Sequence, residues 1–170
     1  MEKRTYSESV ALVEVQDVRV AVLEHRGDPA LIGNSVRAFI AWRTTVGLSP
    51  AVSATFNILY DNPFETAPEA FRLDLCAATQ QDIAPNEAGV VAKVIPGGRC
   101  AVLRYVGADH GLAEALSVLC ADWLPRSGER LREFPIYCQR VRFFPEVPEH
   151  EAITDLFLPL RSRFSTLAQS

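Results

Sequence analysis

The stretch Val20-Ala21-Val22-Leu23-Glu24-His25-Arg26-Gly27 has a counterpart 80 residues later in Cys100-Ala101-Val102-Leu103-Arg104-Tyr105-Val106-Gly107. In both copies a run of four apolar or thiol side chains is followed by three residues and a glycine. The likeness continues through further positions: Ile32, Val36 and Phe39 against Leu112, Leu116 and Leu119, then Trp42 and Gly47 against Trp123 and Gly128 after one inserted residue. This repeat predicts two half-domains that pack about a pseudo-twofold axis and leave a ligand cleft between them.

The first half has the periodicity of a strand, a helix and two further strands. A valine-rich strand is expected over 12–23, with a turn at Gln16-Asp17, and it is followed by three more segments. These are an amphipathic helix over 30–42 that ends at Gly47, a strand over 56–60 and an alternating strand over 71–79. In the alternating strand, Phe71, Leu73, Leu75 and Ala77 share one face, and Arg72, Asp74, Cys76 and Ala78 share the other.

The second half repeats this order. The turn Pro96-Gly97-Gly98 predicts a hairpin between strands over 90–95 and 100–105. The remaining segments are a helix over 111–123 stopped by Pro125 and Gly128, and strands over 134–143 and 154–160. We therefore expect an α+β fold in one domain, with antiparallel sheets, one long helix per half, half-repeats at about 10–80 and 88–160, and a frayed tail over 161–170.

Length and composition exclude several classes of protein. The chain has 170 residues, 48% of them hydrophobic and 22% charged, with a net charge of -4 and a pI near 5.4. An acidic chain without a basic cluster is unsuited to direct nucleic-acid binding. The sequence also lacks a membrane-spanning run and a signal peptide, so we expect a cytoplasmic protein. No segment of helix-turn-helix size precedes residue 10, so we also expect a stand-alone domain.

No residue pattern indicates a metal site, a cofactor or a catalytic nucleophile. Four cysteines lack any C-x-x-C spacing and are predicted to be reduced and buried: Cys76, Cys100, Cys120 and Cys138. The histidines His25, His110 and His150 lie near turns, without a serine or cysteine in a nucleophile-elbow pattern. His25, next to Gly27, is predicted to stabilise its turn.

Several motifs occur in the order found in one known family. They are Val22-Leu23-Glu24-His25-Arg26-Gly27, Tyr60-Asp61-Asn62-Pro63 with Phe71-Arg72-Leu73-Asp74, Ile95-Pro96-Gly97-Gly98, Trp123-Leu124-Pro125-Arg126-Ser127-Gly128, and the closing strand over 154–160. With these motifs the chain resembles the GyrI-like proteins, the effector-binding domain of AraC-type and BmrR-type transcription regulators. The resemblance covers about residues 10–160.

The resemblance implies two pseudo-symmetric β-α-β-β halves with a ligand cleft between them. Members of this family bind bulky, often aromatic and cationic small molecules, usually drugs or toxins. Some are fused to DNA-binding helices and some stand alone. One is known as a gyrase inhibitor, and some hydrolyse cyclopropane-bearing genotoxins.

One position departs from the family pattern. The family commonly carries a buried glutamate in a "P-x-[FY]-E-x-Y" strand, and the resemblance places Pro135-Ile136-Tyr137 on its first part. Cys138 then stands in place of the glutamate and Arg140 in place of the second tyrosine. In a shifted register, Tyr137 would take the second tyrosine's position. A cysteine supplies no carboxylate, so we expect a ligand less cationic than is usual in the family.

The candidate ligand-binding residues are acids and aromatics. Glu24 and Asp74 are the acids; Asp74 has the alternative of a solvated outer-face position, paired with Arg72 or another basic residue. The aromatics can form pocket walls by stacking or can fill the core: Tyr60, Tyr105, Tyr137 and Trp123, with Phe143 and Phe144 behind them.

Three functions remain open. The first is a non-enzymatic domain that binds a lipophilic aromatic molecule, cationic or not, as an effector sensor or a sequestering protein. The second is a hydrolase of electrophilic genotoxins that uses Asp74 or Glu24 with Tyr60 or Tyr105. The third is a protein-binding module that acts on gyrase or another partner, such as a regulator, through an acidic loop of Glu146, Glu149 and Glu151.

Overall fold

The computed structural model describes residues 9–162, and the chain divides into two compact units. Unit 1 combines residues 1–17 with 96–170, and unit 2 is residues 18–95. The tail that the sequence predicts to be frayed lies almost wholly outside the described residues. No helix among the described residues is long and apolar enough to cross a membrane.

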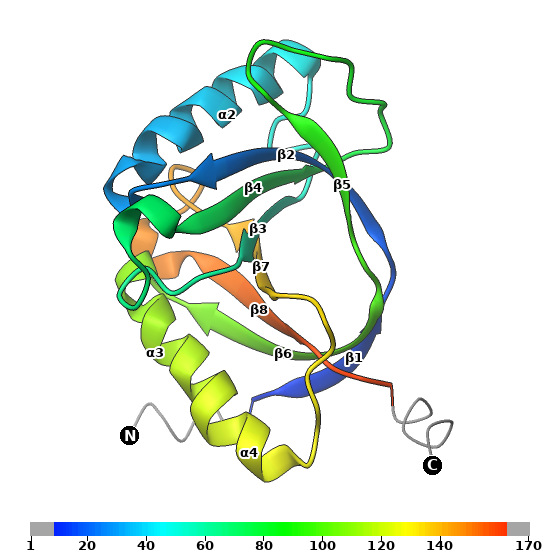
Figure 1. Cartoon of the computed structure of the whole chain (residues 1–170), viewed down its shortest axis with the longest axis vertical. Helices are drawn as coiled ribbons and strands as arrows, with labels where there is room; N and C mark the ends of the chain where they lie inside the picture. Colours follow the sequence, from blue (N-terminus) through cyan, green and yellow to red (C-terminus); the bar gives the residue numbers. More distant parts are fainter. Residues whose placement is uncertain (1–8, 163–170) are drawn as a thin grey trace. The chain divides into compact units, whose positions relative to one another are not determined.

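Unit 2 is an antiparallel sheet with the strand order β3-β4-β2-β5. Its elements are β2 (Val18–Arg26), the 3-10 turn η1 (Pro29–Leu31), α2 (Ile32–Val46), β3 (Thr55–Leu59), the 3-10 turn η2 (Pro68–Ala70), β4 (Arg72–Ala78) and β5 (Val91–Ile95). Figure 1 shows α2 lying along β2 and β4. The helix ends at Gly47, whose φ of +74° is the left-handed conformation that glycine adopts readily, as the sequence predicts.

Unit 1 has the corresponding strand order β7-β8-β6-β1. Its elements are β1 (Ala11–Val15), β6 (Gly98–Val106), the 3-10 turn η3 (Asp109–Gly111), α3 (Leu112–Ser117), the π-helical segment η4 (Val118–Trp123), α4 (Leu124–Ser127), β7 (Ile136–Arg142), the 3-10 turn η5 (Glu149–Glu151) and β8 (Ile153–Pro159). Both units therefore share one order of strands around a strand-helix-strand-strand core. This confirms the predicted α+β class; an origin by duplication and a single domain stay predictions.

The predicted hairpin at Pro96-Gly97-Gly98 is wrong. β5 pairs with β2, and β6 pairs with β1, so the strands on either side of the turn belong to different units. The predicted strand over 12–23 is likewise two strands, β1 in unit 1 and β2 in unit 2, separated at Gln16-Asp17. Alternating side chains indicate an extended chain, but they do not say which strand it pairs with.

The glycine at position 97 is required by a close approach. A Cβ atom there would lie 2.5 Å from the backbone oxygen of Val15. The Gly97 N–H donates to Asp17 Oδ1 at 2.6 Å. The glycine-rich segment therefore lets two backbones pass closely, a role distinct from reversing the chain.

The sequence predicts that the helix of unit 1 stops before Pro125, and this prediction is wrong. It continues through Pro125 to Gly128, whose φ is +75°. In the preceding π-helical segment the Leu124 N–H donates to Leu119 O, five residues back. The wider turn accommodates a proline ring that would crowd the carbonyl four residues earlier in a regular α-helix.

Each helix covers a core on one face of its own sheet. In unit 2 the core cluster includes Phe39 of α2 with Leu75 and Ala77 of β4. In unit 1 it includes Leu119 with Leu103 of β6. Because side chains alternate along a strand, the residues between these positions lie on the opposite face of each sheet, and this is where the charged groups of the candidate site lie.

Candidate functional site

Asp74 lies on the face of unit 2 that is turned away from α2. Its neighbours on β4, Leu73 and Leu75, pack on the helix side, which confirms the predicted alternation. Directly opposite Asp74 stand Glu24 on β2 and Ile58 on β3. The carboxylate is 0% exposed, so it requires partners that compensate for its lost hydration.

Three side chains supply those partners. Asp74 Oδ1 accepts a hydrogen bond from Arg26 Nη1 at 3.0 Å. Asp74 Oδ2 accepts from Lys93 Nζ and from the Tyr60 hydroxyl, each at 2.8 Å. Glu24 completes the group, since its Oε2 accepts from Arg26 Nη2 at 3.0 Å and from Lys93 Nζ at 2.8 Å. We call these five residues the Asp74 cluster.

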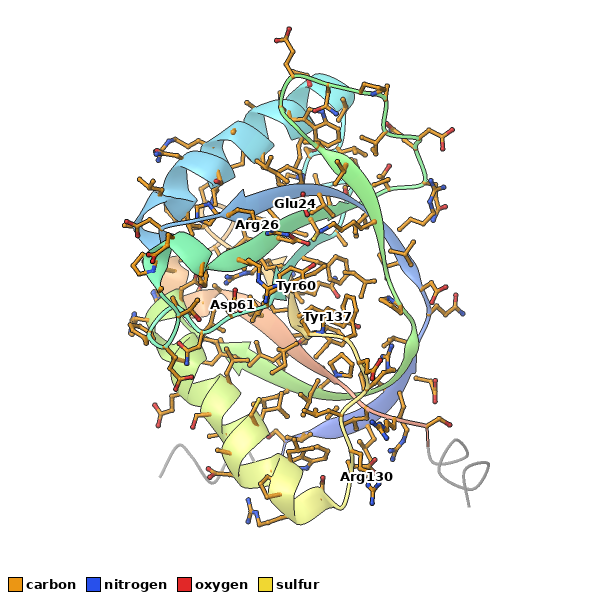
Figure 2. The ribbon with its side chains drawn as sticks, in the orientation of Figure 1. Glu24, Arg26, Tyr60, Asp61, Arg130 and Tyr137 are labelled. Atoms are coloured by element: carbon orange, nitrogen blue, oxygen red, sulfur yellow. The ribbon has the colours of Figure 1, made fainter. Side chains whose placement is uncertain are left out.

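The Asp74 cluster joins four elements of unit 2. Glu24 and Arg26 come from the end of β2, Tyr60 directly follows β3, and Lys93 lies in the middle of β5. Figure 2 shows Glu24 and Arg26 along β2, with Tyr60 nearby. The side chain of Glu24 is 40% exposed and that of Arg26 is 39% exposed. The cluster is therefore buried at Asp74 and open to solvent at Glu24 and Arg26.

Cations surround the ring of Tyr60. The guanidinium carbons of Arg72 and Arg26 lie 5.2 Å and 5.4 Å from its centroid, and Lys93 Nζ lies 5.9 Å away. Burial, and the hydrogen bond to Asp74, raise the pKa of the Tyr60 hydroxyl. The phenol therefore stays protonated and donates to the carboxylate.

The alternative of a solvated Asp74 is wrong, because the residue is 0% exposed, and its basic partners are Arg26 and Lys93 in place of Arg72. Arg72 instead makes a two-pronged ion pair with Asp61, with Nε and Nη2 at 3.0 Å and 3.1 Å from the two carboxylate oxygens. The hydrogen bond from Arg72 lowers the pKa of Asp61. Arg72 projects from the same face as Asp74, but the buried carboxylate forms its ion pairs with Arg26 and Lys93.

Sequence analysis missed Arg26 and Lys93, although each had a signal. Arg26 lies two residues after Glu24 and so shares its face of the strand. Lys93 is the one charged residue in the strand Val91–Ile95. Neither signal shows that β5 pairs with β2, and this pairing brings Lys93 to the acids.

Unit 1 holds a simpler version of the same arrangement. The pair Arg104 and Asp155 on β6 and β8 corresponds to Glu24 and Asp74 on β2 and β4. Arg104 Nε and Nη2 lie 2.8 Å and 3.0 Å from the two oxygens of Asp155. The Arg104 side chain is 57% exposed. A single exposed arginine thus neutralises the acid of unit 1, whereas two cations and a phenol serve the fully buried acid of unit 2.

Tyr137 and Cys138 point to opposite faces of unit 1. The Tyr137 ring stacks on Phe157, with centroids 4.8 Å apart and planes 3° apart. Its hydroxyl lies 3.9 Å from Cys100 Sγ, and burial raises the pKa of the Tyr137 hydroxyl. Cys138 is 1% exposed and belongs to the core cluster with Leu119 on the helix side. The two residues proposed for ligand contact therefore do not share one face, and a ligand role for each stays a prediction.

Tyr105 and His25 hold corresponding turns. The Tyr105 hydroxyl donates to the carbonyl oxygen of Ala108 at 2.8 Å. His25, at the matching position of β2, has Nε2 3.0 Å from the carbonyl oxygen of Asp28 and Nδ1 2.7 Å from Ser35 Oγ. Both rings thus tie a strand end to the turn that follows, as predicted for His25. A ligand contact for Tyr105 stays untested.

The other residues predicted to contact a ligand belong to unit 1. Trp123 packs against the core cluster of unit 1, and Phe143, which follows β7, is half-buried. All four cysteines are reduced, with Cys120 half-buried and the other three buried. Within residues 9–162 no group of His, Cys, Asp or Glu side chains is arranged to hold a metal ion.

Residues 8–161 match the family of GyrI-like small molecule binding domains. The chain therefore belongs to the GyrI-like family, as the order of its motifs indicates. It is 39% identical over 152 residues to the probable transcriptional regulator YgiV of Escherichia coli K12, across 89% of this chain and 95% of YgiV. It is 31% identical over 102 residues to a DNA gyrase inhibitor of Edwardsiella piscicida, across 58% of this chain and 64% of the inhibitor.

Solved structures share the fold. The C-terminal domain of EcmrR superposes with a TM-score of 0.67 at 17% identity, across 90% of this chain and 97% of that domain. In the complex of EcmrR with DNA the chain spans 57% of the length of the EcmrR chain, with a TM-score of 0.71. A hydrolase from Listeria innocua has a TM-score of 0.57 at 14% identity, across 94% of this chain and 96% of the hydrolase.

Proposed function

We propose that this small-molecule binding domain takes a hydrophobic aromatic molecule against the Asp74 cluster, and that it acts in the cytoplasm as an effector sensor or a sequestering protein. The proposal rests on one observation: a fully buried carboxylate held by Arg26, Lys93 and Tyr60 on the sheet face away from the helix. Such a network combines flat groups that stack on aromatic rings with hydrogen-bond donors that orient a ligand. The relation to the probable transcriptional regulator YgiV supports a sensing role.

Apart from the charged Glu24 and Arg72, the neighbours of Asp74 on the same face are apolar. Val22 is 0% exposed, Ile58 1% and Cys76 0%. These buried side chains give the polar groups of the cluster apolar surroundings, which strengthen polar contacts with a ligand at the exposed Glu24 and Arg26. A position for this ligand between the two halves stays a prediction from the sequence.

Ligand binding is tested by a panel of aromatic compounds in thermal-shift and fluorescence titrations. We expect Tyr60→Ala to weaken the best ligand by about tenfold or more, since it removes a stacking ring. Tyr60→Phe keeps the ring and serves as the matched control, with little loss expected. If no compound shifts the melting temperature of the wild-type protein, the proposal fails.

A gyrase-directed role is the second candidate, and it rests on the relation to the gyrase inhibitor of Edwardsiella piscicida. The acidic loop residues Glu146, Glu149 and Glu151 would form the contact. Its test is a DNA supercoiling assay with gyrase and purified protein, with the triple glutamine variant of the loop as control. Unchanged supercoiling at excess protein removes this candidate.

The geometry does not favour the hydrolase alternative. Asp74 is 0% exposed, and its oxygens accept from Arg26, Lys93 and Tyr60. The side chain of Glu24 is 40% exposed, but its Oε2 is held by Arg26 and Lys93. A carboxylate that activates water must reach that water directly. The rate of cyclopropane opening, followed by chromatography, tests this alternative, and we expect no acceleration over buffer.

A further inference from the structure

Lys93 occupies a place suited to an organic cation. Its Nζ lies 2.8 Å from an oxygen of Glu24 and 2.8 Å from an oxygen of Asp74. The same atom lies 5.9 Å from the ring centroid of Tyr60. Two carboxylates beside an aromatic ring attract an ammonium or another lipophilic cation through ion pairing and cation–π contact.

We propose that Lys93 acts as a built-in cation which fills this place and makes the domain select uncharged aromatic ligands over lipophilic cations. This inference rests on the proposed function, because it assigns the ligand class of the same site. Lys93 is a specificity-determining residue under this proposal, and its charge competes directly with that of any cationic ligand.

The charges of the Asp74 cluster support this role. Glu24 and Asp74 carry two negative charges, and Arg26 and Lys93 carry two positive charges, so the cluster is neutral. Burial by itself lowers the pKa of Lys93, but its hydrogen bonds to Asp74 and Glu24 outweigh burial and raise it. Lys93 therefore remains charged at neutral pH, and no net negative charge is left to attract a ligand cation.

Lys93 is better placed than Arg26 to exclude a cation. Arg26 Nη1 also donates to the backbone oxygen of His25 at 3.0 Å, which ties its guanidinium to the strand. The Lys93 ammonium reaches the acids at the end of a flexible stem. In unit 1 the position that corresponds to Lys93 is Val13, so a lysine here is no requirement of the fold.

The test compares two probes with one ring skeleton: acridine, which is uncharged at about pH 8, and the fixed cation 10-methylacridinium. Their affinities are measured by fluorescence titration against wild-type protein and Lys93→Met. We expect the wild type to bind acridine about tenfold or more tightly than the cation. We expect Lys93→Met to bind the cation about tenfold or more tightly than the wild type does, because without the lysine the cluster has a net negative charge.

Two further variants separate charge from shape. Lys93→Arg keeps the charge and should retain the wild-type preference. Lys93→Met combined with Glu24→Gln opens the same space but restores charge balance, so it should show no gain for the cation. Lys93→Gln removes the charge but keeps a donor for Asp74, and it replaces Lys93→Met if circular dichroism shows that the methionine variant is unfolded.

The outcomes distinguish this inference from the proposed function. If Lys93→Met binds acridine as the wild type does but gains nothing for the cation, the inference is overturned and the proposed function stands. Equal affinity of the wild type for both probes overturns it as well. If neither probe binds to the wild type or to any variant, and the wider panel also fails, both fail together.

Discussion

Removal of the buried carboxylate should destabilise the protein far more than removal of its counterpart in unit 1. The two substitutions are Asp74→Ala and Asp155→Ala, which occupy corresponding positions on β4 and β8. Asp74 is 0% exposed and has three partners. The Asp155 side chain is 14% exposed and is paired with Arg104. The two substitutions thus compare a buried acid with a partly hydrated acid at corresponding positions of the two units.

The expected magnitudes follow from burial. Breaking a buried ion pair costs about 3–5 kcal/mol when it leaves a buried charge alone. Here the Arg26 and Lys93 side chains are 39% and 28% exposed, and Lys93 keeps Glu24, so part of this energy is recovered by hydration. We expect a cost of about 3 kcal/mol for Asp74→Ala. For Asp155→Ala, with an exposed arginine as partner, we expect about 1 kcal/mol.

The measurement is the free energy of unfolding in urea at neutral pH, followed by tryptophan fluorescence. Trp42 lies in unit 2 and Trp123 in unit 1, so both units carry a reporter. If Asp74→Ala costs no more than Asp155→Ala, the reasoning from burial and compensation is refuted.

The other predictions concern ionisation and backbone packing. The pKa of Tyr60 and that of Tyr137 are both raised, chiefly by burial, so the stability they contribute is present below about pH 10 and is lost as the pH rises through the folded values. Tyr60→Phe and Tyr137→Phe should each remove one late component from an alkaline absorbance titration and reduce this loss; an unchanged titration contradicts the assignment. Gly97→Ala should cost about 2 kcal/mol or more in urea unfolding, because its Cβ would lie 2.5 Å from a backbone oxygen. Gly33→Ala, a helical control whose Cβ meets a side-chain nitrogen at 3.4 Å, should be neutral or stabilising by up to about 1 kcal/mol; equal costs for the two glycines would contradict the packing argument.

Sequence patterns predicted most elements because each pattern reflects local geometry. The helix that ends at Gly47 and the alternation around Asp74 both follow from positions within one segment. The helix through Pro125 escaped prediction because a π-helical segment precedes it. The wider turn of this segment removes the clash between the proline ring and the carbonyl four residues earlier, and this clash is the reason why a proline is expected to end a helix.

The candidate site was predicted only in part. Glu24, Tyr60 and Asp74 were named from their residue types and motifs, and the structure brings them together. Their link to Lys93 escaped prediction because the glycine turn at 96–98 favoured a local hairpin. The actual partner of β5 is β2, which lies much earlier in the chain.

The sequence by itself determined the α+β order of elements, the family and the faces of the strands, because apolar periodicity and turn residues act over a few positions. The tertiary structure decided the partners of Asp74. Arg26, Tyr60 and Lys93 lie 48, 14 and 19 positions from Asp74 in the sequence. Only the pairing of β2 with β4 and β5 brings Arg26 and Lys93 within hydrogen-bond distance, and the pairing of β3 with β4 does so for Tyr60. A buried carboxylate requires compensation, but the chain alone does not show which cations supply it.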